Sequence, residues 1–186
     1  MRMSSRVLLL LGLVLCFPML GCQRVPYGIQ PVQFQPERYL GRWYEVARFD
    51  HWFERGLANT TADYSMRPDG TIQVINRGYD PVKGTWNEAH GVAKFADGRH
   101  TADLNVTFFW PFYGKYVVFA LDQKHYNYAM VTSGSRDYLW ILSRTPVMDP
   151  LIFTELYLKA RDEGFAVEKL ILVPQNGRRT MLQGRD

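Results

Sequence analysis

The run GRWYEVARFDH, residues 41 to 51, is the stretch that decides how this chain folds. It is rich in residue types that favour β-strands, namely Trp43, Tyr44, Val46 and Phe49. Gly41 has no Cβ, which suits a position where the backbone turns tightly or lets an aromatic ring pass close by. Because an indole is costly to leave in water, the run predicts a first strand from about Trp43 to Asp50 that is buried near its start.

Short strand-like segments continue along the chain after this run, separated mostly by short turns. The clearest turn is Pro68-Asp69-Gly70, which lies between two β-rich segments and is typical of a hairpin. Eight or nine strands are expected in all, and those after the first cover residues 60–67, 71–79, 85–87, 91–95, 101–109, 115–122, 126–132 and 138–143. This spacing predicts an all-β domain, either a sandwich or an up-and-down barrel, and periodicity alone does not separate the two.

One helix interrupts the strand pattern near the end of the chain. Asp149 is a suitable N-cap with Pro150 at the first helical position, and Gly164 is a suitable C-terminal stop. The predicted helix, about 149–163, carries an apolar face formed by Ile152, Leu156 and Ala160. A last strand is expected at 165–173, followed by a polar tail at 176–186.

Residues 1–21 have the composition of an export signal. A basic start precedes an apolar run of about nine residues, which is too short to span a bilayer as a mature helix. Cleavage before Cys22 would remove Cys16 as well, so the mature chain would have one cysteine and no internal disulfide. The Pro-containing segment 22–36 is expected to be an extended tether, and the folded domain is expected to cover residues 37–175.

Charge and motif content exclude several classes of function. The net charge is +4, and without Arg2 and Arg6 of the export signal the chain has 20 basic and 18 acidic residues, which gives no case for binding nucleic acid. Phosphate-binding loops, dinucleotide-binding glycine motifs and the nucleophile elbow of hydrolases are missing from the sequence. The histidines have no metal-ligand spacing, so neither a metal nor a cofactor is expected at His51, His90, His100 or His125.

A second stretch, DYLWILSRTP at residues 137–146, adds weight to the run at 41–51. There a predicted strand ends in Arg144, whose guanidinium could cap an aromatic ring. Together the two stretches resemble the lipocalin family, and the bacterial outer-membrane lipocalins in particular, over roughly residues 34–175. The resemblance implies an eight-stranded antiparallel up-and-down barrel with one C-terminal α-helix and a short final strand. A barrel of this size has an interior just wide enough for one small ligand.

The resemblance also assigns roles to particular residues. Trp43 and Arg144 correspond to the pair that closes the barrel floor, where the guanidinium lies across the indole in a structural cation–π contact; the alternative is two unrelated residues. Gly21-Cys22 is similar to a lipoprotein signal, in which Cys22 is lipidated and becomes the N-terminus. Gln23, in place of Asp after that cysteine, then implies an anchor at the periplasmic face of the outer membrane. The alternative is simple secretion with an ordinary thiol.

Glu45 is the main candidate for a polar group inside the barrel. It lies two residues after Trp43, so strand alternation predicts that both side chains point to one side, together with Ala47 and Phe49. If that side is the interior, Phe49 lines the cavity. Glu45 is then either a structural carboxylate with Arg or Tyr partners or a group that contacts the ligand.

Two loops, His51 to Phe53 and Trp110 to Tyr113, carry more aromatic residues than a strand pattern explains. The resemblance places the first at the open mouth of the barrel, where it either folds over as a lid or contacts a membrane or a partner. Its candidate ligand-contacting residues are Trp52, Phe53 and Arg55. For the second loop, Trp110 to Tyr113, plain packing against the barrel is expected.

The resemblance therefore implies a membrane-anchored, non-enzymatic protein that holds a fatty acid or a lysophospholipid for storage or transport. Single-chain lipids are expected to bind better than diacyl lipids or haem. One alternative is an enzyme of the same fold, in which Glu45 or a mouth histidine works with Tyr126 or Tyr128. The other is a structural envelope protein whose barrel is filled by its own side chains. The sequence leaves the oligomeric state open, a homodimer included.

Overall fold

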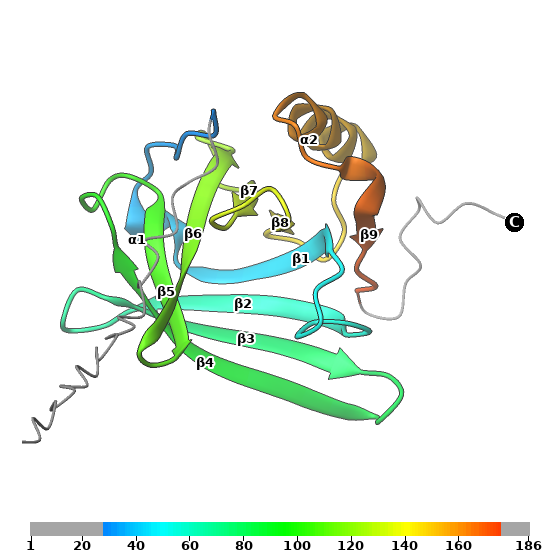
Figure 1. Ribbon diagram of the computed structural model, residues 1–186, viewed down its shortest axis with the longest axis horizontal. Helices are drawn as coiled ribbons and strands as arrows, with labels where there is room; N and C mark the ends of the chain where they lie inside the picture. The colour runs from blue at the N-terminus through cyan, green and yellow to red at the C-terminus, as the bar shows by residue number, and fades with distance from the viewer. Residues whose placement is uncertain (1–27, 176–186) are drawn as a thin grey trace, which may run out of the picture.

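The computed structural model describes residues 28–175, which form a closed β-barrel with one helix packed on its outer side (Figure 1). The predicted export signal, Cys22 with the first part of the tether, and the polar tail at 176–186 lie outside the described residues. No helix within the described range has the length and the apolar character needed to cross a membrane.

Eight strands follow one another as antiparallel neighbours and form the barrel. The first strand pairs with both the second and the eighth, which closes the sheet. Their bounds are Gly41–Phe49 for β1, Ala58–Met66 for β2, Ile72–Asp80 for β3, Thr85–Phe95 for β4, Asp103–Phe109 for β5, Phe112–Leu121 for β6, Tyr128–Thr132 for β7 and Leu139–Ser143 for β8. Tertiary pairing thereby decides between sandwich and barrel, which periodicity leaves open.

Two segments differ from the expected strands. The short strands expected at 85–87 and 91–95 are one continuous strand, β4, which pairs with β3 along its length. The final strand expected at 165–173 is instead a 3-10 turn, η1 (Val167–Lys169), followed by the three-residue strand β9 (Leu170–Leu172) beside β1. The strand is short because Phe165 is buried against the helix instead of continuing a ladder.

The helix α2 (Pro150–Asp162) has the caps that the sequence predicts. The Asp149 carboxylate accepts a hydrogen bond from the Leu151 backbone N–H at 2.7 Å, and Gly164 follows with a left-handed backbone (φ 83°). The helix packs on the outside of the barrel in a cluster that we call the outer core, which includes Val46, Phe49, Phe119, Met130, Ile141, Leu156, Ala160 and Phe165. It therefore covers outward-facing side chains of the strands that would otherwise meet water.

The segment before β1 belongs to the folded body, so the expectation of a tether up to residue 36 is wrong from Ile29 onward. Ile29 and Phe34 are buried, and the Val32 backbone donates to the Val118 carbonyl and accepts from the Ala102 N–H. A short helix, α1 (Pro36–Tyr39), then leads into β1. The proline content predicts extension, but the apolar side chains in this extended chain pack against the barrel.

Inside the barrel lies a second apolar cluster, which we call the interior core. Its buried members include Trp43, Tyr64, Ile72, Val74, Ala93, Leu104, Val118, Val131 and Leu142. Side chains that are only partly buried pack against it, among them Ala62, Val106, Phe108, Tyr116 and Trp140. Two separate clusters thus lie on opposite faces of the same strands: the outer core packs against the helix, and the interior core lies inside the barrel.

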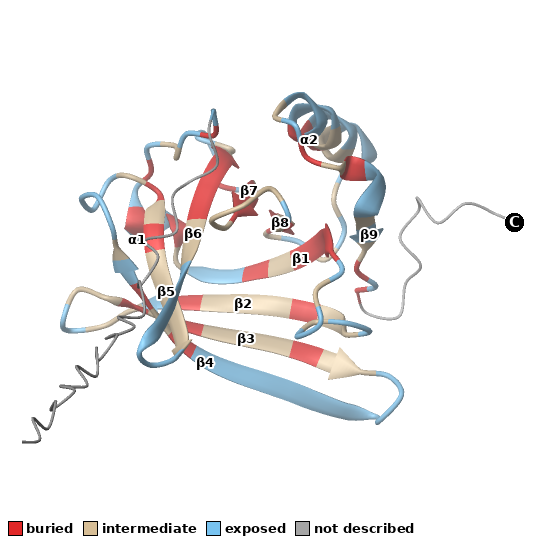
Figure 2. Ribbon diagram, in the orientation of Figure 1, coloured by how far each residue is buried: buried red, intermediate tan, exposed pale blue. Residues whose placement is uncertain are grey.

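Strand order decides which connections share an end of the barrel. The connections after β1, β3, β5 and β7 lie at one end, which we call the open end; those after β2, β4 and β6 lie at the other, the closed end, together with α1. The half of β4 nearest the open end has no β5 neighbour, because β5 pairs only with residues 92–95 of β4. Figure 2 shows this half of β4 as exposed.

Candidate functional site

Strand β1 supplies the first side chains of the candidate site through a break in its alternation. Its ladder with β8 shifts register just after Glu45, which is a β-bulge. Trp43 and Glu45 therefore face the interior, and after the bulge Arg48 does so too. Phe49 packs in the outer core, where its ring centre lies 6.4 Å from that of Phe165. Strict alternation places Phe49 inside the barrel, and that prediction is wrong because the bulge reverses the order of faces.

The closed end is organised by Arg144, whose guanidinium lies 3.9 Å from the centre of the Trp43 ring. Its three nitrogens also donate to backbone carbonyls, those of Arg38 at 2.7 Å, Arg42 at 2.8 Å and Tyr126 at 3.2 Å. The Trp43 indole is fully buried and donates to a backbone carbonyl of α1 at 2.8 Å. These contacts tie three segments together into a floor at the closed end.

Three tyrosine hydroxyls form a chain inside the barrel next to this floor. The Tyr116 hydroxyl lies 2.8 Å from both the Tyr39 and the Tyr64 hydroxyl. Burial raises the pKa of all three phenols, so they remain neutral. The Tyr39 ring also packs on Trp43, with ring centres 4.8 Å apart. No sequence pattern predicts this chain, because its members come from α1, β2 and β6, which only the closed barrel brings together.

Near the open end, Arg48 organises a buried cluster of charged groups, and its side chain is only 1% exposed. Nη1 of Arg48 lies 2.7 Å from Glu45 Oε1, and Nη2 donates to the Glu54 backbone carbonyl at 2.6 Å. Nη2 also reaches the Leu57 carbonyl at 3.3 Å. Oε2 of Glu54 accepts a hydrogen bond from the Trp140 indole at 3.0 Å. We call Glu45, Arg48, Glu54 and Trp140 the mouth cluster.

The two carboxyl groups of the mouth cluster have unusual proton affinities. Burial raises the pKa of Glu45 to about 8, and the nearby Glu54 carboxylate adds to that shift. Burial also raises the pKa of Glu54. Arg48 opposes both shifts, but a single cation does not compensate two buried anions. The charge carried by these two carboxyl groups therefore responds to any charged group that a ligand brings.

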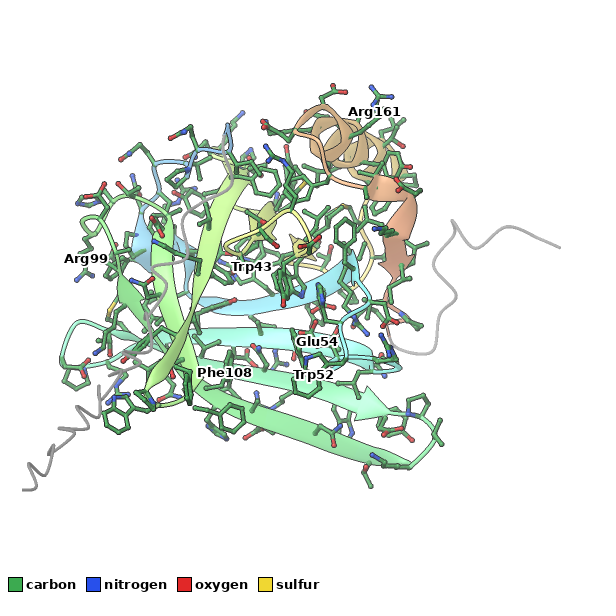
Figure 3. All side chains as sticks on the ribbon, viewed as in Figure 1. Trp43, Trp52, Glu54, Arg99, Phe108 and Arg161 are labelled. Atoms are coloured by element: carbon green, nitrogen blue, oxygen red, sulfur yellow. The ribbon has the colours of Figure 1, made fainter. Side chains whose placement is uncertain are left out.

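The aromatic residues of the β1–β2 connection, of which Figure 3 labels Trp52, lie at the open end in different environments. The His51 ring stacks on Phe53 and Tyr138, with ring centres 5.6 and 4.2 Å away, and burial lowers the pKa of His51. Trp52 is 82% exposed, and Arg55 is exposed and paired with a neighbouring aspartate at 2.9 Å. His51 thus packs the connection against the residue that precedes β8. Trp52 faces solvent instead of folding over the barrel as a lid.

The β5–β6 connection is the second aromatic loop, and the expectation that it packs against the barrel is wrong. Phe109, Trp110 and Phe112 are 80%, 81% and 77% exposed. The physical reason is the short overlap between β4 and β5, which ends at Thr107. Beyond that residue the hairpin has no neighbouring strand to pack on.

The residues named for an enzymatic alternative are not brought together. Tyr126 lies at the closed end, where its hydroxyl accepts a backbone N–H at 2.9 Å, and Tyr128 borders the outer core. The ionisable neighbours of Glu45 are instead Arg48 and Glu54, neither of which was predicted from the sequence.

The signal available for Arg48 was its charge within an apolar part of β1, but only the bulge turns its side chain inward. Glu54 lies in a connection, where no periodic pattern predicts its direction. Within residues 28–175, no group of three or more His, Cys, Asp or Glu side chains is arranged to hold a metal ion.

The chain matches the family model of the lipocalin-like domain over residues 34–175. It is 48% identical over 165 residues to the outer membrane lipoprotein Blc of Vibrio cholerae, with 88% of this chain and 96% of that protein covered. Identity to the outer membrane lipoprotein Blc of Escherichia coli is 51% over 153 residues, with 82% and 86% covered. Apolipoprotein D of Mus musculus is 34% identical over 154 residues, with 78% and 80% covered.

Solved structures share the fold at lower identity. The cockroach allergen Per a 4 superposes with a TM-score of 0.66 at 16% identity, covering 83% of this chain and 96% of that one. Insecticyanin from the tobacco hornworm Manduca sexta gives a TM-score of 0.63 at 20% identity, with 78% and 83% covered. These structures agree in fold, and the family match and the sequence identities show that the chain belongs to the lipocalin family.

Proposed function

We propose that this protein is an outer-membrane lipoprotein that binds a single-chain lipid, a fatty acid or a lysophospholipid, inside its barrel for storage or transport in the envelope. The observation that carries the proposal is an apolar interior core with one group of charged side chains, the mouth cluster, near the open end and away from the floor at the closed end. An acyl chain in the interior would leave water, while a polar head would stay beside charged groups. The names of two close relatives, both outer membrane lipoproteins, support the location.

The energetics favour one acyl chain. A chain of about sixteen carbons has a gross driving force of roughly 12 kcal/mol, at about 0.8 kcal/mol per methylene. Immobilising the ligand and nearby side chains removes several kcal/mol, so we expect a dissociation constant of about one micromolar or below. Two chains side by side, or a haem, suit a small barrel less well. We place the polar head near Trp52, Phe53 and Arg55, next to Glu45 and Arg48.

A displacement titration tests the proposed ligand class. Protein loaded with a fluorescent fatty acid is titrated in parallel with lysophospholipid, diacyl phospholipid and haem, and native mass spectrometry of detergent-free protein identifies any lipid that co-purifies. Single-chain lipids should displace the probe most effectively. If diacyl lipid or haem competes at least as well, the proposed ligand class is wrong.

Two matched variants test whether the ligand lies inside the barrel. Val106→Trp adds bulk next to the interior core, whereas Asn105→Trp adds the same bulk on the opposite face of β5. Val106→Trp should weaken binding of the fluorescent fatty acid by roughly tenfold or more, since the ring occupies space that the chain needs. Asn105→Trp should bind normally. Equal affinities for the two variants would place the ligand elsewhere.

Attachment through Cys22 is tested by Cys22→Ser. Acyl chains contribute about 0.8 kcal/mol per buried methylene to membrane binding, so the variant should lose stable fractionation with outer membranes and remain folded. Mass spectrometry of the mature N-terminus should show acylated Cys22 in the parent protein only. An unacylated Cys22 in the parent, or unchanged stable fractionation of the variant, would contradict the proposed anchor.

Catalysis is the second candidate function because Arg48 and Glu54 give Glu45 the ionisable neighbours that an acid–base site needs. We favour binding, since the Glu45 carboxyl is already tied to Arg48. The test incubates lysophospholipid with the protein and follows its ester bond by mass spectrometry. We expect no release of fatty acid above the protein-free rate. Release that Glu45→Gln abolishes would establish an enzyme instead.

A further inference from the structure

Exposed large apolar side chains gather at one end of the barrel. Of the twelve among the described residues, four lie in the segment from Val147 to Ile171, and the closed-end connections carry none. The other eight lie on or next to the open-end connections after β1, β3 and β5. We call these eight residues the rim: Trp52, Phe53, Val82, Trp86, Phe109, Trp110, Phe112 and Tyr113. Exposed apolar groups concentrated in this way mark a contact surface.

The β5–β6 hairpin carries the largest group of exposed aromatic residues among these eight. Phe109 and Phe112 are ladder partners across its tip, with Trp110 between them in the sequence, and in Figure 1 the tip points away from α2. Nζ of Lys94 lies 5.6 Å from the Tyr113 ring centre beside the tip. Aromatic rings next to a lysine suit the headgroup level of a membrane, where the rings enter the apolar boundary and the amine stays among phosphates.

The proposed lipid anchor holds the folded body close to the membrane. Five residues separate Cys22 from Gly28, the first described residue. Fully extended, they reach roughly 20 Å at about 3.6 Å per residue. A domain of this size is roughly 40 Å across, from a radius of gyration of about 15 Å. The reach is shorter than the body is wide, so some face of the barrel stays at or near the headgroups.

We propose that this face is the open end, and that the rim aromatics dock it on the phospholipid surface that carries the anchor. The inference rests on the proposed attachment through Cys22. The three connections of the open end that carry the rim residues join different pairs of strands. They are therefore spread around the end of the barrel instead of forming one patch on its side. In the proposed orientation the lipid surface contacts residues of these connections. A single-chain lipid then passes between the membrane and the barrel interior without crossing bulk water.

Spin labelling of the lipidated protein tests the orientation. Acylation consumes the Cys22 thiol, so one introduced cysteine carries the only label in the mature chain. Labels are placed by Trp110→Cys at the rim, by Lys124→Cys at the closed end, and by Leu151→Cys on α2, which matches the rim in apolar exposure. Proteins are reconstituted in vesicles of phosphatidylethanolamine and phosphatidylglycerol. Collision rates with oxygen and with a water-soluble nickel chelate report the depth of each label.

The label at position 110 should become several-fold more accessible to oxygen relative to the nickel chelate, while the labels at 124 and 151 stay aqueous. An aqueous label at 110, or insertion of the label at 124 or 151, overturns the proposed orientation. Dipolar broadening at position 110 without vesicles would show that the hairpin binds a second copy instead, and would also overturn it. Label incorporation without any introduced cysteine would show that Cys22 is free, which refutes the anchor.

A second measurement keeps docking separate from ligand binding. In Cys22→Ser protein, the triple change Phe109→Ser, Trp110→Ser and Phe112→Ser should weaken vesicle affinity by on the order of tenfold, and leave the affinity for fluorescent fatty acid in solution unchanged. The matched triple change Val147→Ser, Leu151→Ser and Leu158→Ser removes exposed apolar groups near and on α2 and should alter neither. Equal vesicle affinities for the two triple variants contradict docking through the rim, whereas lost fatty acid binding would bear on the ligand site alone.

Discussion

Each end of the barrel is organised by one arginine, and the two arginines have different partners. At the closed end, Arg144 stacks on Trp43 and donates only to backbone carbonyls. At the open end, Arg48 donates to backbone carbonyls and also to the Glu45 carboxylate, with Glu54 as a second carboxyl nearby. Carbonyls and rings do not titrate, whereas carboxyls do. The same side chain therefore builds a fixed floor at one end and an adjustable charged site at the other.

The distribution of apolar side chains follows the same division. The closed end buries its aromatics, Trp43 and Tyr39 among them, whereas the open end exposes Trp52 and Trp110. Burial of large rings stabilises the fold, and exposure of equally large rings does not. The closed end thus contributes stability, and the open end keeps groups that a ligand or a lipid surface can contact.

Arg48→Met should have the largest effect on stability. It leaves Glu45 and Glu54 buried without a cation, and breaking a buried ion pair in this way costs about 3–5 kcal/mol. Urea unfolding at neutral pH measures the loss. The double variant Arg48→Met/Glu45→Leu should recover most of it, since an apolar replacement of a whole buried pair is often neutral. No recovery would mean that Arg48 stabilises mainly through the carbonyls of the β1–β2 connection.

Arg144→Ala should have the next largest effect on stability. The free energy of unfolding should fall by about 2–3 kcal/mol, because the variant loses the cation–π contact and the hydrogen bonds to carbonyls. Affinity for the fluorescent fatty acid should not change, because the floor makes no contact with the proposed head site. Arg144→Lys is the control: it keeps the charge but cannot serve three carbonyls, so it should recover only part of the stability. An unchanged melting temperature together with abolished binding would reverse the roles of the two ends.

The pH dependence of stability should come from the open end. The pKa of Glu45 is about 8 in the folded protein, above its ordinary value of 4.5, so the folded state binds more protons than the unfolded state between these values. The stability from this group is full below about pH 4.5 and is lost as pH rises through 8. We expect the free energy of unfolding to decline steadily across this window, and urea unfolding at a series of pH values measures the decline.

Two variants locate the source of that decline. Glu45→Gln should flatten it, because the amide does not titrate, while Arg144→Ala should be less stable at every pH and keep the same slope. A stability that rises between pH 4.5 and 8, or a slope unaffected by Glu45→Gln, would show that the protons belong to another group.

Phe109→Ser and Trp110→Ser should have the smallest effect, within about 0.5 kcal/mol each, because substitutions of exposed side chains change few contacts. Thermal unfolding of the two variants beside the parent protein measures this. A loss above about 1 kcal/mol would mean that the rim aromatics are packed in solution, and the difference between the two ends would then be smaller than the structure indicates.

Several features of the fold could be predicted because they depend on local chemistry. The capping residues Asp149 and Gly164 bound α2, and the Pro68-Asp69-Gly70 turn joins β2 to β3. Features that a long-range partner decides could not be predicted in this way. Phe49 faces outward because of a bulge in the β1–β8 ladder, and Trp110 is exposed because β5 overlaps β4 only briefly.

The sequence by itself determined the strand-rich pattern, the single late helix and the two stretches that carry Trp43 and Arg144, since residue type and spacing act over a few neighbours. Only the tertiary structure decided that the sheet closes, that Arg48 turns inward beside Glu45, and that the rim aromatics remain uncovered. Register and closure are the physical reason. A shift of one residue in a ladder moves a side chain to the other face, and no local pattern records which strand it will meet.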